Sequence, residues 1–167
     1  MSSLVGLIFN KKYHRGFTLV ELLVTISIIA LLAVGVILSF QHQRAKARDA
    51  LRLANLNQFK TALALYHSEV GLYPIGSSMH LGSAPEGQTI YTCLSGEGFK
   101  ISCNADDKIF MVAVPGDPTS GQYFIYQSFI DNSGYAIDFT MEVGTDVVGK
   151  DENCLTIDGI MPGFCNL

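Results

Sequence analysis

The chain has few charged residues for its length. Lys, Arg, Asp and Glu make up 16% of its 167 residues, whereas soluble globular proteins contain roughly 25%. The mean hydropathy is +0.30, and aromatic and β-branched residues continue to the C-terminus, which argues against intrinsic disorder. A composition this apolar, in a chain about as long as one ordinary domain, suggests that part of it lies in lipid or within an assembly.

The acidic and basic residues are unevenly distributed. Residues 1–16 contain three basic and no acidic residues, and residues 41–70 have a net charge of +3. Residues 71–167 contain three lysines and 12 acidic residues, a net charge of −9. Because nucleic-acid binding depends on Lys and Arg neutralising phosphates, this acidic half is not expected to bind nucleic acid.

The motifs of common enzyme classes are absent. The sequence has no HExxH, GxSxG, Walker or GxGxxG pattern, so zinc, nucleophilic and phosphate chemistry lack a framework. The histidines are scattered along the chain, at His14, His42, His67 and His80. The sequence therefore predicts that the protein is not an enzyme.

The longest uncharged stretch lies near the N-terminus. No charged residue occurs between Glu21 and Arg44, and the first proline is Pro74. As a helix, these 22 residues would extend about 33 Å, enough to cross a hydrocarbon core of about 30 Å. The stretch is too long for a secretory signal peptide, and no small-x-small cleavage site follows it. We therefore expect one continuous helix from Phe17 to about Val70, with a transmembrane first part.

Glu21 is the most informative single residue in this stretch. On insertion scales a carboxylate costs roughly 2.5–3.5 kcal/mol at the middle of the bilayer, and less towards a helix end. A charge at such a place points to a function that involves a charged partner. Alternatively, Glu21 simply lies in the first helical turn, where the helix dipole favours an acidic side chain.

The residues around Glu21 resemble a known signature. Residues 16–21 read Gly-Phe-Thr-Leu-Val-Glu, follow a short basic leader and precede the apolar helix. This combination resembles the N-terminal signature of type IV prepilins and pseudopilins. The resemblance implies an α+β, pilin-like fold, in which the second half of a long N-terminal helix packs on a small antiparallel β-sheet.

The resemblance also implies a division of the chain and a processing event. The expected segments are a leader peptide (1–16), a transmembrane and filament-core helix (17–40), the amphipathic half of the same helix (41–74) and an extracytoplasmic β head (75–167). In this family a membrane-embedded prepilin peptidase cuts after the glycine, here between Gly16 and Phe17, and N-methylates the new terminus at Phe17. The family also gives Glu21 a partner, the terminal amine of Phe17 on a neighbouring subunit.

The segment from 41 to 70 is amphipathic. Apolar residues recur at every third or fourth position and form one stripe that needs a sheet to cover it: Leu56, Phe59, Leu63, Tyr66 and Val70. A basic cluster precedes the stripe and is expected to face solvent or lipid headgroups: Arg44, Lys46, Arg48 and Arg52. We expect the helix to end near Gly71.

The remaining sequence predicts about three antiparallel strands. Residues 75–108 are rich in Gly and Ser, with a short strand near residues 89–93, and residues 109–114 are typical of a buried strand. Residues 123–130 and 135–142 flank the turn-rich sequence Asp-Asn-Ser-Gly and predict a β-hairpin.

The sequence contains four cysteines and no CxxC pair: Cys93, Cys103, Cys154 and Cys165. An even number beyond a membrane segment favours two disulfides in an oxidising compartment, although four buried thiols remain an alternative. Of the three connectivities, we favour the sequential pairs Cys93–Cys103 and Cys154–Cys165, because each closes a short loop with little regular structure. The family resemblance supports the second pair, since pilins commonly close a C-terminal loop in this way.

One acidic loop is a weak candidate for calcium. Asp146, Asp151 and Glu152 offer the oxygen ligands that calcium prefers, but their spacing matches no defined motif. We therefore expect no metal or other cofactor, with calcium as the alternative.

The sequence predicts a structural subunit of a type IV pilus-like filament. By resemblance, it inserts in the membrane with a cytoplasmic N-terminus and an extracytoplasmic head. A prepilin peptidase, an assembly ATPase and an inner-membrane platform protein would act on it, before it joins a cell-surface pilus or a cell-envelope filament. The alternatives are a pseudopilin of a type II secretion or competence DNA-uptake system, a minor pilin that binds a ligand at the filament tip, and a single-pass membrane-anchored binding protein.

Overall fold

The structure, a computed structural model, describes residues 16–165, without the side chains of residues 35–39. The expected leader therefore lies outside the described residues, except for Gly16. The chain divides into two units, residues 1–40 and residues 41–167. They are described separately below.

One long helix, α1, extends from Leu19 to Val70. It begins two residues later than predicted because Thr18 caps it: the Glu21 N–H donates to Thr18 Oγ1 at 3.2 Å, the arrangement of a helix N-cap. At the other end, Gly71 has a φ of 84°, and its N–H donates to the His67 carbonyl at 2.8 Å. A left-handed glycine of this kind stops a helix, so the predicted end is confirmed.

In the N-terminal unit, the described side chains of α1 are exposed up to residue 34. Most are large and apolar, and they include Leu19, Leu22, Leu31 and Leu32. Within the described residues, no helix has the combination of length and apolarity needed to cross a membrane. The transmembrane segment expected at residues 17–40 is therefore not confirmed.

In the second unit, α1 contributes an apolar stripe to the core of the head. Leu56, Phe59, Leu63 and Tyr66 are buried as predicted, and Phe59 packs edge-to-face on Phe124 with ring centroids 5.4 Å apart. Val70 is an exception, with 46% of its surface exposed. It is the last residue of the helix, so no further turn holds it against the sheet.

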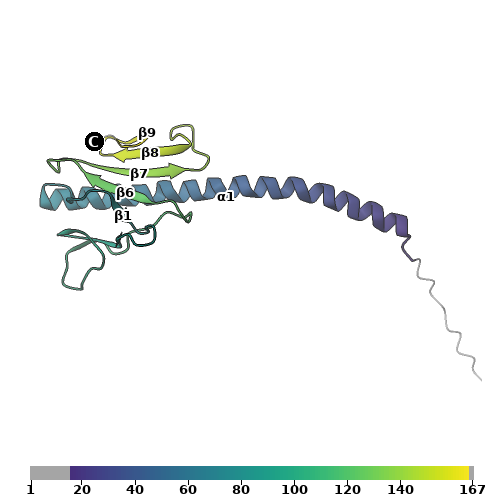
Figure 1. Cartoon of the computed structure of the whole chain (residues 1–167), viewed down its shortest axis with the longest axis horizontal. Helices are drawn as coiled ribbons and strands as arrows, with labels where there is room; N and C mark the ends of the chain where they lie inside the picture. The colour runs from purple at the N-terminus through teal and green to yellow at the C-terminus, as the bar shows by residue number, and fades with distance from the viewer. Residues whose placement is uncertain (1–15, 166–167) are drawn as a thin grey trace, which may run out of the picture. The chain divides into compact units, whose positions relative to one another are not determined.

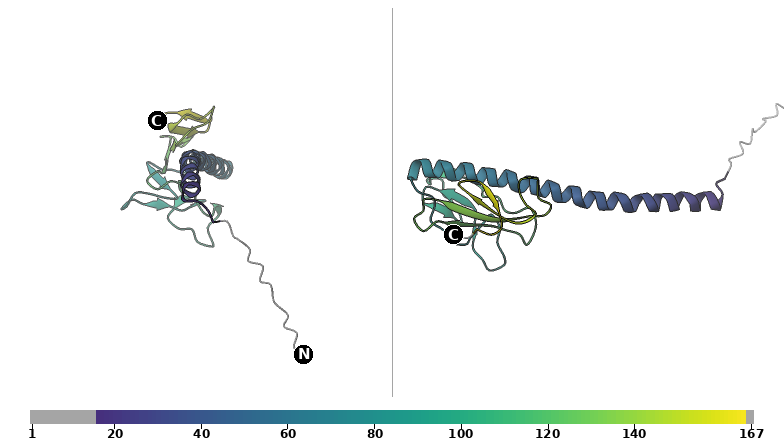
Figure 2. Two further views of the ribbon diagram at one scale, coloured as in Figure 1. Left: turned by 90° about the vertical axis from the view of Figure 1, so that its right-hand side faces the viewer. Right: turned by 90° about the horizontal axis from the view of Figure 1, so that it is seen from above.

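A six-stranded sheet covers this stripe (Figures 1 and 2). Its order is β2-β1-β6-β7-β8-β9, and every neighbouring pair is antiparallel except β1 and β2. The strands are β1 (Met79–Leu81), β2 (Ile90–Tyr91), β6 (Phe124–Ser128), β7 (Tyr135–Met141), β8 (Asp151–Thr156) and β9 (Ile160–Pro162). The predicted hairpin is β6–β7, and the predicted α+β, pilin-like layout is confirmed.

A second sheet has three strands in the order β4-β3-β5. They are β3 (Cys93–Ser95), β4 (Gly98–Lys100) and β5 (Ile109–Met111). The prediction of a buried strand at residues 109–114 was wrong in its extent and in its burial, since Ile109 is exposed and the other two residues of β5 are only partly buried. The strand ends at Met111, and the next residue, Val112, is 80% exposed. The apolar run therefore continues into a surface loop.

Candidate functional site

The residues of the N-terminal motif are accessible. Gly16 is exposed, Phe17 is 76% exposed, and Glu21 lies exposed in the first turn of α1. The Thr18 cap fixes where the helix begins and so places the Glu21 carboxylate near the positive end of the helix dipole. Within residues 16–165, the Glu21 side chain makes no ion pair.

The helix that follows the motif presents a continuous apolar surface. Soluble monomers rarely expose apolar patches larger than a few hundred Å², yet nearly every side chain of residues 19–34 is apolar and exposed. The larger ones are Leu19, Val20, Leu22, Leu23, Val24, Ile26, Ile28, Ile29, Leu31, Leu32 and Val34. Such a surface is suited to burial against lipid or against other helices.

A buried guanidinium links α1 to the loops of the head. The Arg52 side chain is 0% exposed, as is that of Asp117, and the two form a bidentate pair with both N–O distances at 2.8 Å. Arg52 Nη1 also donates to Asp49 Oδ1, one turn earlier on the helix, at 2.6 Å. Bidentate, charge-assisted hydrogen bonds are among the strongest in proteins. Burial acts to lower the pKa of Arg52, but the ion pairs with its carboxylate partners outweigh this effect and raise the pKa.

Glu142, just after β7, is the third anion of this network. Arg48 forms a two-point ion pair with it, Arg52 Nη1 lies 3.1 Å from its Oε1, and the Thr119 hydroxyl donates to it at 2.8 Å. The hydrogen bonds from Arg48 are the main reason why the pKa of Glu142 is lowered to about 2.

Asp49 fixes the loop between β7 and β8 through backbone hydrogen bonds. Its carboxylate accepts the N–H groups of Glu142, Val143 and Gly144 at 2.9, 2.8 and 3.1 Å. Burial favours the neutral carboxyl, but these bonds and the one from Arg52 outweigh it, so the pKa of Asp49 is lowered. α1 is thereby joined to the sheet by directed polar contacts as well as by its apolar stripe.

This network corrects the prediction for the basic cluster. Arg44 and Lys46 are exposed as expected, whereas Arg48 and Arg52 form ion pairs with acidic residues of the same chain. The sequence held a signal for Arg52: it lies four residues before Leu56 and is in phase with the apolar stripe. A charged residue at a core position of a helix implies a buried partner.

Both favoured disulfides are present in the structure. Cys93 in β3 pairs with Cys103, and Cys154 in β8 pairs with Cys165 near the C-terminus. Each closes a segment of ten or eleven residues. The alternative of four free thiols is therefore wrong.

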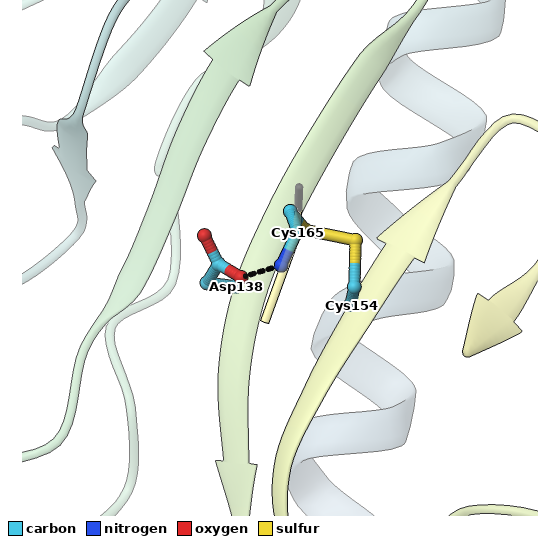
Figure 3. A group of neighbouring side chains, drawn as sticks. All are labelled: Asp138, Cys154 and Cys165. Carbon is cyan, nitrogen blue, oxygen red and sulfur yellow. Dashed lines mark hydrogen bonds between the residues drawn. A yellow bond between two sulfur atoms is a disulfide. The ribbon is translucent and has the colours of Figure 1, made fainter. Parts of the chain in front are cut away.

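The calcium candidates do not gather into a cluster of acidic side chains in the described part of the chain. Asp146, Asp151 and Glu152 are exposed, and in the described part of the chain they are not among the acidic, His or Cys side chains that cluster in threes. The cluster found there is Asp138, Cys154 and Cys165 (Figure 3). Both of its sulfurs are engaged in a disulfide, so it offers no thiolate ligand.

The comparisons with known proteins agree with the N-terminal geometry. A family model of the prokaryotic N-terminal methylation motif matches residues 11–37. The chain carries the prepilin-type N-terminal motif. The match includes the proposed cleavage site, Thr18, Glu21 and most of the exposed apolar helix.

A curated relative points in the same direction. The type IV major pilin protein PilA of Myxococcus xanthus (strain DK1622) is 32% identical to the chain over 99 residues, which cover 59% of this chain and 41% of that protein. The alignment thus spans about two fifths of the relative's length. No solved structure matches the chain. Together, the prepilin-type motif and this relative support a pilin or pseudopilin subunit.

Proposed function

We propose that this chain is a structural subunit of a type IV pilus-like filament and that it assembles through α1. The observation that carries the proposal is the prepilin-type motif immediately before an exposed apolar helical surface. A prepilin peptidase would cut between Gly16 and Phe17 and N-methylate Phe17. The exposure of both residues supports this step, because a peptidase must reach the bond that it cuts.

The apolar surface of α1 supports storage in a membrane followed by assembly. Burial of apolar surface stabilises by about 25 cal/mol per Å², so residues 19–34 would be covered either by lipid or by helices of other subunits. Exchange between these two environments costs little hydrophobic free energy, because lipid tails are about as apolar as leucine. An assembly ATPase and an inner-membrane platform protein would move the subunit from membrane to filament.

Glu21 is proposed to direct the assembly. Cleavage creates an ammonium at Phe17, and the Glu21 carboxylate of an adjacent subunit would pair with it. In an apolar environment a paired charge is far less costly than a single one, so the pair would favour one register between helices.

The head is proposed to lie outside the cytoplasm and to form the filament surface. Its two disulfides are typical of an oxidising compartment, and its sequence from residue 71 onward has 12 acidic residues against three lysines. The relative is named a major pilin, which favours a pilus over the secretion and DNA-uptake alternatives.

The test replaces Glu21 and measures filaments sheared from cells that also express the assembly machinery. Glu21→Ala should leave cleavage largely intact, because the peptidase site precedes it, but should reduce sheared filaments severalfold or abolish them. Ser27→Ala on the same helix is the matched control, since the Ser27 hydroxyl is uncharged and donates to the Leu23 carbonyl of its own helix. Normal filament yield from Glu21→Ala would contradict the charge-pairing role.

A further inference from the structure

A carboxylate lies beside the C-terminal disulfide. Asp138 on β7 is the strand partner of Cys154 on β8, and its Oδ1 accepts the N–H of Cys165 at 2.7 Å (Figure 3). One carboxylate oxygen of Asp138 and the two sulfurs lie within 4.8 Å of one another. Side chains from two strands and the C-terminal segment therefore meet at one point.

The surroundings of this group are poorly solvated. Cys154 is only 2% exposed, and Asp138 and Cys165 are half-buried. Burial raises the pKa of Asp138, although the N–H of Cys165 acts in the opposite direction. In such surroundings charges are weakly screened, so a carboxylate affects a developing charge nearby more strongly than it would in water.

A cavity gives small molecules access to the disulfide. It has a volume of about 330 Å³ and is lined by both cysteines together with Phe129, Met161 and Phe164. Because Cys154 is the more buried cysteine, an external thiol would reach the sulfur of Cys165 more easily.

Reduction of this disulfide would pass through negatively charged sulfur. A thiolate attacks Sγ of Cys165, a new S–S bond forms, the bond to Cys154 breaks, and its electron pair leaves on Cys154 Sγ. A second thiolate then attacks the mixed disulfide, so two thiols are oxidised to one disulfide and the two cysteines are reduced and take up protons. The rate depends on how well the leaving sulfur tolerates its charge.

We propose that Asp138 is a positioning residue that slows the reduction of Cys154–Cys165. Its carboxylate opposes both the approach of an anionic thiolate and the charge that develops on Cys154, while its hydrogen bond holds Cys165 close to its partner. The disulfide that closes the C-terminal loop would thus resist reduction by small thiols, despite the cavity beside it. This role does not depend on the proposed filament function.

The test measures the reduction of each disulfide separately. The full chain in mild non-ionic detergent is treated with an anionic thiol (2-mercaptoethanesulfonate) or a cationic one (cysteamine) at equal thiolate concentration. Timed alkylation and peptide mass spectrometry then give the rate at each cysteine. Cys93–Cys103 is an internal control, and Asp146→Asn removes one charge from an exposed loop as the matched variant.

Asp138→Asn keeps a hydrogen-bond acceptor but removes the charge. We expect it to accelerate reduction of Cys154–Cys165 by the anionic thiol about three- to tenfold, with a smaller change for cysteamine. The rate of reduction of Cys93–Cys103, and the rates of both disulfides in Asp146→Asn, should stay within about twofold of the rates in the unmodified chain. Unchanged rates in Asp138→Asn would overturn the proposal, as would an equal acceleration with both thiols, which would indicate loosening of the loop.

Discussion

Arg52 occupies a position in α1 that the helical pattern assigns to the apolar core, four residues before Leu56. Its charge is tolerated there because Asp49, Asp117 and Glu142 surround it. Removal of one member of a buried ion pair leaves the others uncompensated. We therefore expect every member of the network to be needed for the stability of the head. Replacement of the whole network by well-packed apolar residues is a different change, because it leaves no charge without a partner.

Substitution of Arg52 should destabilise the head strongly. We expect Arg52→Ala to lower the free energy of unfolding by about 3–5 kcal/mol. Arg52→Lys should lower it less, because the charge remains while the bidentate geometry is lost. The free energy of unfolding can be measured by urea titration of the full chain in mild detergent, with the near-UV circular dichroism of the buried tyrosines as the signal. Arg44→Ala, an exposed change on the same helix, should stay within about 0.5 kcal/mol; an equal effect of the two alanine variants would refute a special role for Arg52.

The same network predicts sensitivity to acid. The pKa of Glu142 is lowered from its ordinary value of 4.5 to about 2, and that of Asp49 is also lowered. A lowered carboxyl pKa in the folded state contributes stability above the ordinary pKa, and this contribution is lost as the pH falls towards the folded value. Between about pH 5 and pH 2, stability should therefore fall by an amount on the order of 2 kcal/mol from Glu142.

Glu142→Gln isolates this contribution, because Gln does not titrate. The variant should be less stable than the unmodified chain at pH 7, and the difference should shrink as the pH is lowered to 2. Urea titrations at a series of pH values provide the measurement. A difference that stays constant with pH would mean that ionisation of Glu142 does not matter.

Residue roles were predictable where they follow a local pattern. The prepilin-type signature at residues 16–21 could be read from the sequence. The two cysteine pairings were favoured among three connectivities, and the structure contains them. The partners of Arg52 could not, because Asp117 and Glu142 are 65 and 90 residues away and become neighbours only through the fold. The sequence showed that Arg52 was in phase with the core, but not which acidic residues would meet it.

At the scale of elements, β1 ends where two backbone segments come very close. Gly82 has a φ of +68°, and a Cβ placed on it would lie 2.3 Å from the backbone of Pro115 and Gly116. Gly87 has a φ of +83°, but a Cβ there would meet nothing within 4 Å. The two glycines therefore share a backbone conformation and differ in the space around them.

Alanine substitutions at Gly82 and Gly87 should distinguish the effect of the close backbone contact on stability from the effect of the backbone conformation. Gly87→Ala should lower the free energy of unfolding by about 1–2 kcal/mol, because alanine is disfavoured in a left-handed conformation. Gly82→Ala should lower it clearly more, because the loop at residues 115–116 must also move. Thermal unfolding of the full chain in detergent measures both. If Gly82→Ala were no more destabilising than Gly87→Ala, the contact with the 115–116 backbone would not constrain the head.

The elements themselves were predicted unevenly. The β6–β7 hairpin follows from two alternating apolar segments around a turn-rich sequence, and it is confirmed. The short strand predicted near residues 89–93 corresponds to β2, and strands β1, β3, β4, β8 and β9 were not predicted. Four of them have only three residues, which is too short for an alternating pattern to be recognised. The fifth, β8, begins with the acidic pair Asp151 and Glu152, which were expected in a loop. Pairing with β7 stabilises β8 in spite of its polar start.

At the scale of the molecule, the two units have contrasting surfaces. The described part of the N-terminal unit exposes an apolar helix, whereas the second unit has its own core and sequence-distant ion pairs. The sequence predicted this contrast, because charge is absent between Glu21 and Arg44 and acidic residues dominate after residue 71.

Intact mass spectrometry can show whether the chain is processed as a prepilin. The full chain is co-expressed with a prepilin peptidase and extracted in detergent, with Gly16→Ala as the matched variant that should remain uncut. We expect the mass of residues 17–167 plus one methyl group, less the four hydrogens of the two disulfides. An uncut, unmethylated chain, obtained while the same peptidase cleaves a known prepilin in parallel, would contradict this expectation.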